Sequence, residues 1–258
     1  MKFSLAFAAL GMHLSGVCAD YRHPVETKIP THGPDADMIS FLTKGLMCAK
    51  NPVLFKGRLA ADAVAPTRIL SVSKKEPDKK MQYNENAIIT PNDRCSMFNF
   101  ELDSRRTFER HCTMIFSFAA GGQLRKNDVY KYEGPKDGGH FDFHGYNFNK
   151  WGIEGETTWN NQPDWKHGVP NPPPRMKQGY SYVISSAPCG VEKDFGWWKL
   201  SVIMCATDAT FIFPQKYDSC PLGFYVILSD KPPKLPANQK RDVGYPWGHY
   251  AAEGRRYC

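Results

Sequence analysis

Four acidic side chains in the middle of the chain could do chemistry on a sugar polymer. They are Asp142, Glu154, Glu156 and Asp164. Paired carboxylates hydrolyse glycosidic bonds when they stand about 5 Å or about 6.5–9.5 Å apart, a separation that sequence spacing does not set. A solvated loop explains the same residues equally well. A secreted polysaccharide-active hydrolase that uses these loop carboxylates is therefore the alternative hypothesis.

Three tryptophans in the same stretch point to binding rather than catalysis. Trp151, Trp159 and Trp165 precede a proline-rich run, and a long segment of this kind is usually functional or an insertion. Exposed indole rings stack on sugar rings or anchor a protein partner. The other interpretation is that the rings fold back and plug one end of the domain. Both interpretations remain open from the sequence.

The histidines and cysteines do not predict a metal site or a cofactor. His140 and His144 are four residues apart, but in a strand that spacing separates them by about 13 Å, which is too far for one ion. His111 precedes Cys112, yet no third group that would orient a nucleophilic pair is identifiable. We expect no catalytic residue, no metal and no cofactor.

Short segments of alternating polarity must position these residues. Phe98 and Phe100 share one side of the segment 97–102, and 112–118 repeats the period of two with Thr113 and Ser117 opposite the apolar residues. Such alternation predicts strands with one buried and one solvent-facing side. Further strands are expected at 68–73, 87–89, 128–133, 140–143, 178–186, 197–205, 211–213 and 222–228. The series predicts an all-β fold, an antiparallel β-sandwich or jelly-roll-like domain.

The ends of the chain differ from this middle part. Residues 1–19 have the charge, apolar run and small-residue cleavage site of a secretory signal peptide. We expect a short helical or irregular leader at 20–65, the sandwich at 66–228 and an irregular basic, proline-rich tail at 229–258. No later segment is long and apolar enough to predict a membrane anchor.

Cysteine content and net charge limit the compartment and the kinds of partner that we expect for this protein. Of eight cysteines, Cys18 would leave with the signal peptide, so seven remain. Secreted cysteines pair, and an odd number leaves one available for an intermolecular disulfide. The net charge is +7, but the basic residues are scattered and no nucleic-acid motif appears. We do not expect a nucleic-acid partner.

An ordered series of short motifs resembles a known family. The series is RILSVSKKEPDKKMQYN, TPNDRCSMFNFEL, HCTMIFSFAAGGQL, YKYEG, GYSYVISSAPCG and CPLGFYVIL. It is similar to fungal secreted proteins with the ubiquitin 3 binding protein But-two C-terminal domain, over roughly residues 68–228. The resemblance implies an all-β domain in secreted or cell-wall-associated proteins. The namesake's partner is intracellular, which conflicts with the signal peptide, so that partner is not carried over.

The resemblance also implies a disulfide. Cys112 and Cys189 match the family's own pair. Cys95 and Cys220 begin the first and last strong strands of the matched region, and such strands are often neighbours in a jelly roll, so we expect a second disulfide between them. The remaining cysteines have no assigned partner: Cys48, Cys205 and Cys258.

The predicted function follows from these features. The chain should be a secreted, non-catalytic fungal β-sandwich protein, either cell-wall-associated or an effector-like extracellular binding protein. Its expected partner is a cell-wall polysaccharide or a host or other extracellular protein. The leader, the tryptophan-rich segment and the tail depart from the family's motifs, so the contacts are expected there, at Trp151, Trp159 and Trp165.

Overall fold

The computed structural model describes residue 48 and residues 58–124, 128–164, 175–215 and 220–233. Every pairing between two named strands in this part is antiparallel. The expected all-β, antiparallel, disulfide-bonded fold is confirmed. None of the helices in the described ranges has the length and apolar character needed to cross a membrane.

Alternation in the sequence, together with the near-continuous apolar run at 222–228, predicts all of the described strands except one. The strands are β1 (Arg68–Ser73), β2 (Gln82–Tyr83), β3 (Asn86–Ile89), β4 (Arg94–Asp103), β5 (His111–Phe118), β6 (Lys131–Glu133), β7 (Phe141–Gly145), β8 (Tyr180–Pro188), β9 (Trp197–Ala206), β10 (Thr210–Pro214) and β11 (Gly223–Ser229). Three short helical turns are α2 (Ser104–Thr107), η2 (Gly121–Gln123) and η3 (Lys193–Phe195). The missed strand is β2, whose two residues are too few to show a period.

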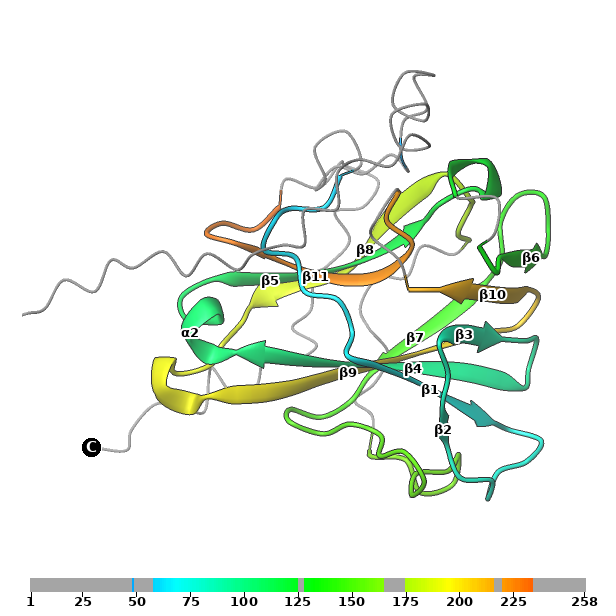
Figure 1. Cartoon of the computed structure of the whole chain (residues 1–258), viewed down its shortest axis with the longest axis horizontal. Helices are drawn as coiled ribbons and strands as arrows, with labels where there is room; N and C mark the ends of the chain where they lie inside the picture. Colours follow the sequence, from blue (N-terminus) through cyan, green and yellow to red (C-terminus); the bar gives the residue numbers. More distant parts are fainter. Residues whose placement is uncertain (1–47, 49–57, 125–127, 165–174, 216–219, 234–258) are drawn as a thin grey trace, which may run out of the picture.

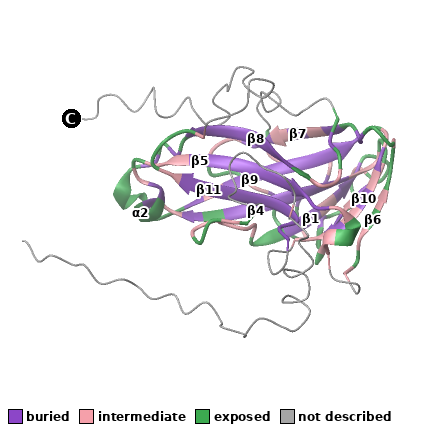
Figure 2. Cartoon of the chain, turned by 90° about the horizontal axis from the view of Figure 1, so that it is seen from above, coloured by how far each residue is buried: buried purple, intermediate pink, exposed green. Residues whose placement is uncertain are grey.

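The strands form three sheets arranged like a sandwich. A five-stranded sheet has the order β2-β1-β4-β9-β7, the β5 sheet has the order β11-β5-β8, and the β10 sheet has the order β3-β10-β6. The β5 sheet lies over the five-stranded sheet, and the β10 sheet closes one end (Figure 1). Seen from above, the long strands of both layers are buried along most of their length (Figure 2).

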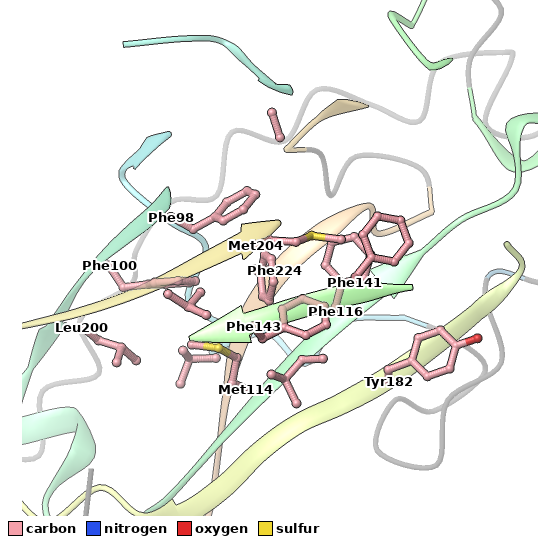
Figure 3. Close-up of a cluster of buried hydrophobic side chains, with 14 of the residues drawn as sticks. Phe98, Phe100, Met114, Phe116, Phe141, Phe143, Tyr182, Leu200, Met204 and Phe224 are labelled. Atoms are coloured by element: carbon pink, nitrogen blue, oxygen red, sulfur yellow. The ribbon is translucent and has the colours of Figure 1, made fainter. Parts of the chain in front are cut away.

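Phenylalanine side chains from all three sheets make the core. The ring of Phe116, on β5, lies 4.8 Å from that of Phe224 on β11 and 5.6 Å from that of Phe213 on β10. It also lies 6.4 Å from the ring of Phe143 on β7. Figure 3 shows Phe116, Phe143 and Phe224 gathered between strands. The rings meet at tilted and edge-to-face angles, which aromatic pairs prefer.

Both sides of the central strands are largely buried, so the expected solvent-facing side was wrong except at Glu101, which is exposed. Asn99 of β4 is 2% exposed, and Thr113 and Ser117 of β5 are 1% and 0% exposed. The polar groups are satisfied within the protein. Thr113 Oγ1 lies 2.8 Å from Ser186 Oγ, and Ser117 Oγ lies 2.9 Å from Ser181 Oγ. Polar side chains that hydrogen-bond to one another can be buried in this way.

Two apolar clusters cover the outer sides of the sheets. The outer cluster of the five-stranded sheet comprises Leu70, Val72, Met81, Cys95, Met97, Tyr146, Ile203 and Cys205. The outer cluster of the β5 sheet comprises Ile115, Val183, Tyr225 and Ile227. Trp159 packs against the first cluster, and Leu59, Ala63 and Ala65 pack against the second. Segments between or before the strands therefore shield both outer sides from water.

The disulfides agree with one of the two expected pairs. Cys112 joins Cys189, as the family resemblance implies. The expected Cys95–Cys220 disulfide was wrong, because Cys95 joins Cys205 with Cα atoms 4.5 Å apart. These two residues lie on the adjacent strands β4 and β9. Directly opposed residues of a non-hydrogen-bonded antiparallel pair have this Cα separation.

Cys220 has a different partner for a topological reason. It is buried in the core between the sheets and joins Cys48. Cys95 belongs to the outer cluster of the five-stranded sheet, so its side chain points away from that core. Cys18 and Cys258 lie outside the described residues, and the intermolecular disulfide remains a prediction.

The expected leader is described in part. Val64 N donates to Val226 O over 2.8 Å, and Val226 N donates to Val64 O over 2.9 Å, so this part of the leader pairs with the edge strand β11. The signal peptide at 1–19, the leader before residue 58 apart from Cys48, and the tail beyond residue 233 lie outside the described residues. The predicted domain boundaries remain predictions.

We expect Phe116→Ala to lower the free energy of unfolding by about 3–5 kcal/mol, because it removes the ring that contacts all three sheets and leaves a cavity. Urea denaturation followed by circular dichroism, with the disulfides intact, measures the change. Phe195→Ala is the matched control, since that ring is 48% exposed and its loss should cost about 0.5 kcal/mol. Equal losses in the two variants would contradict the position of Phe116 in the core.

Candidate binding face on the five-stranded sheet

Residues 146–164, which we call the outer loop, cross the outer side of the five-stranded sheet, except that Phe148 packs against Trp198 of the core. Backbone hydrogen bonds fasten this loop to both halves of the sheet. Tyr146 N donates to Ser201 O on β9 over 3.1 Å. Met81, next to β2, accepts at its carbonyl from Gly155 N over 2.9 Å. The loop is therefore held across the whole width of the sheet.

Asn99 holds the middle of the outer loop. Its Nδ2 donates to Gly152 O over 2.9 Å, and its Oδ1 accepts from Ser201 Oγ over 2.8 Å. Both ends of the buried amide are therefore satisfied. Removing one partner of such a bond costs about 1–3 kcal/mol, because the other is left buried without a hydrogen bond. The position on β4 thus fixes where the loop touches the sheet.

Gly152 lies closer to the sheet than a side chain would allow. Its N–H donates to Met97 Sδ over 3.2 Å. A Cβ at this position would stand 2.5 Å from Met97 Sδ and 3.1 Å from Met81 Sδ. Glycine therefore leaves room at this point for the side chains of Met97 and Met81 against the loop backbone. Trp151 and Ile153 flank this point of contact.

A hollow of about 440 Å³ opens between the outer loop and the sheet. Its lining combines an indole ring with two carboxylates, a guanidinium and an amide. The lining residues are Thr67, Arg68, Leu70, Asn99, Glu101, Trp151, Gly152, Ile153 and Glu154. An aromatic surface with a few polar groups is typical of small-molecule sites. We call this feature the Trp151 hollow.

Charged groups of both signs surround the indole. Glu101 on β4 lies directly opposite Lys199 on β9, and Lys199 Nζ lies 4.3 Å from the centroid of the Trp151 ring. The Arg68 guanidinium lies 5.4 Å from the centroid of the Tyr83 ring. Cations favour such positions over aromatic faces. These contacts hold the side chains around the hollow in defined positions.

The structure assigns different surroundings to the predicted tryptophans. Trp151 lines the hollow. Trp159 is partly buried against the outer cluster of the five-stranded sheet, with Lys74 Nζ 5.0 Å from its ring centroid, and it does not line the hollow. Trp165 lies outside the described residues. The binding role of these rings remains a prediction, and Trp151 is the ring best placed for it.

The four predicted carboxylates do not gather in one place. Asp142 lies on β7, and Glu154 Oε1 accepts a hydrogen bond from the N–H of Tyr83 on β2 over 3.2 Å. β7 and β2 are opposite edges of the five-stranded sheet, about 19 Å apart at about 4.8 Å for each strand crossed. This separation exceeds that of a hydrolytic pair.

The hollow instead brings Glu154 together with a carboxylate that the sequence did not single out. This carboxylate is Glu101, whose position on β4 faces the outer loop. Glu156 and Asp164 also lie on the outer loop but do not line the hollow. The carbonyl of Asp164 accepts from Asn147 N over 3.4 Å, which closes the base of the loop.

The histidines lie apart from the hollow. His140 Nε2 lies 3.6 Å from Asp142 Oδ1. Burial lowers the pKa of His144, against the opposing effect of the Asp142 carboxylate, so its imidazole tends to be neutral. Among the described residues, no group of three histidine, cysteine or acidic side chains is placed to hold a metal. Cys112, next to His111, is in a disulfide and has no free thiol for nucleophilic attack.

Sequence reasoning overlooked Trp197 at the start of β9. It is 65% exposed and lies opposite Asp103 of β4, whereas its neighbour Trp198 is 1% exposed in the core. Hydrogen bonds from the Arg105 side chain lower the pKa of Asp103, so this carboxyl is ionised and paired. Adjacent residues of a strand point to opposite sides. The tryptophan pair was therefore itself a signal that one ring faces outward.

We expect Asn99→Ala to loosen the outer loop, because the carbonyl of Gly152 loses its buried donor. Hydrogen exchange followed by mass spectrometry should show faster exchange at residues 147–158. The free energy of unfolding should fall by about 1–3 kcal/mol. Ser201→Ala is the matched control, since it leaves the bond from Asn99 to Gly152 in place and should not change exchange in the loop. Equal acceleration in both variants would contradict the role of Asn99.

One protein family matches the strands just described. Residues 64–219 match the model of the family described as Ubiquitin 3 binding protein But2 C-terminal domain. This match covers more than half of the 258-residue chain and includes all strands from β1 to β10. No curated protein matches the chain. The extent of the family match shows that the chain belongs to the But2 C-terminal domain family.

Proposed function

We propose that this protein is a secreted, non-catalytic binding protein that attaches to polysaccharide of the fungal cell wall. The signal peptide expected at residues 1–19 supports secretion. Three disulfides are compatible with an oxidising compartment. Membership of a family named for a binding protein supports a binding role. The fungal setting and the wall association come from the resemblance of the motifs.

The Trp151 hollow is the observation that carries this proposal. A sugar ring presents apolar C–H groups on its faces and hydroxyl groups around its rim. The Trp151 indole offers a flat apolar surface for such a face. Glu101 and Glu154 accept hydrogen bonds from hydroxyl groups, and Arg68 donates them. The lining therefore matches both parts of a sugar.

The partner named in the family description is not assigned to this chain. The description concerns ubiquitin 3 binding, and we take such a partner to be intracellular. A secreted protein would not meet it. An extracellular protein is the competing partner, and the binding experiment below separates it from polysaccharide.

Polysaccharide hydrolysis is a second candidate, because Glu101 and Glu154 line the same hollow. If this candidate were correct, incubation with soluble wall polymers would release reducing sugar, and Glu101→Gln or Glu154→Gln would abolish the release. We expect no release above that of a buffer blank from the unmodified protein. Release that is lost in both variants would contradict the non-catalytic proposal.

We expect the mature protein to sediment with insoluble β-glucan or chitin, and Trp151→Ala to weaken this binding about tenfold, equivalent to about 1.4 kcal/mol. Trp151→Phe keeps an aromatic face and should retain most of the binding. Circular dichroism and the midpoint of thermal unfolding check that the variants fold. The proposal fails if the folded protein sediments with neither polymer, or if folded Trp151→Ala binds as well as the unmodified protein.

A further inference from the structure

Trp197 faces the same side of the five-stranded sheet as the Trp151 hollow. Residues of β9 alternate between the two sides, and Trp198 and Leu200 belong to the core. Trp197 and Lys199 must therefore point outward. Ser201, the next residue on that side, bonds Asn99 beneath the outer loop. The exposed indole therefore lies two residues along β9 from Lys199, whose ammonium contacts the Trp151 ring at the hollow.

Lys199 connects the two tryptophans. Its Cα lies about 7 Å from that of Trp197, two residues along the strand, and its ammonium lies 4.3 Å from the Trp151 ring centroid. Its backbone N–H donates to Asn149 Oδ1 over 3.0 Å, which holds the start of the outer loop beside β9. The sequence of groups along the outer side is therefore Trp197, Lys199 and then Trp151 at the hollow.

The charges of the groups that line the hollow or contact the Trp151 ring are balanced. The cations Lys199 and Arg68 are matched in number by the carboxylates Glu101 and Glu154. Asp103, opposite Trp197, forms a salt bridge with Arg105 over 3.1 Å. A face without net charge gives no electrostatic preference for a charged polymer. Its many donors and acceptors suit a ligand rich in neutral hydroxyl groups.

We infer that Trp197 and Trp151 form one continuous binding face for a neutral glycan chain, with Trp197 contacting sugar units that extend beyond the hollow. This inference rests on the proposed function and adds to it a second contact residue and the restriction to neutral, linear chains. Trp197 is 65% exposed, so its ring is available without rearrangement. One aromatic ring on β9 and another on the outer loop can contact successive units of a linear chain, which a single sugar cannot do.

The experiment measures affinity for neutral β-glucan oligosaccharides of increasing length by isothermal titration calorimetry. For the mature protein, affinity should rise from disaccharide to hexasaccharide. Trp197→Ala should weaken hexasaccharide binding about tenfold and leave disaccharide binding nearly unchanged. Tyr180→Ala is the matched control, because this aromatic side chain is 46% exposed at the start of β8 in the other layer. It should bind both oligosaccharides normally.

The outcomes separate this inference from the proposed function. If insoluble polymer binding depends on Trp151 but Trp197→Ala binds hexasaccharide normally, the extended face is wrong and the hollow remains the site. If binding requires an acidic polymer and disappears at high salt, the ligand class is wrong, since screening weakens charge contacts between exposed groups. If Tyr180→Ala weakens binding as much as Trp197→Ala, the location on the five-stranded sheet is wrong.

Discussion

Strand β4 is buried on both sides, and this constraint shapes the rest of the molecule. On the inner side, Phe98 and Phe100 enter the core between the sheets. On the outer side, Met97 and Asn99 lie beneath the outer loop. A buried amide must find hydrogen-bond partners, and Asn99 finds them in the loop and in β9. The packing of one strand therefore determines both the core and the position of the candidate binding face.

Many of the strands are predictable, because the alternation of apolar and polar residues is visible within each short segment. Phe98, Phe100 and the residues of 112–118 alternate strictly, and they form the strands β4 and β5 as expected. The order of strands in a sheet depends on contacts between distant segments, which explains why the predicted Cys95–Cys220 disulfide was wrong. Cys95 pairs with Cys205 because β4 neighbours β9, and nothing in the spacing of these cysteines encodes that neighbour. The buried outer sides were also unpredictable, because segments remote from the strands cover them.

The candidate site was predictable only where residue type or local alternation indicates it. Trp151 stood out by residue type, and it lines the hollow. Glu101 and Arg68 belong to strands whose alternation marks them as outward-facing, but sequence does not show which outward residues a loop will enclose. The prediction for the segment 197–205 considered only the residues that face the core, beginning with Trp198. It therefore did not single out Trp197, which faces outward. Trp197 is the first residue of β9 and is 65% exposed.

A crystal structure with a bound neutral oligosaccharide tests the central claim most directly, which is that the outer side of the five-stranded sheet is the ligand face. The account predicts sugar rings against Trp151 and Trp197, with hydroxyl groups bonded to Glu101 and Arg68. Sugar bound on the β5 sheet instead, or no bound sugar in crystals soaked at saturating concentration with this face open to solvent, would contradict it.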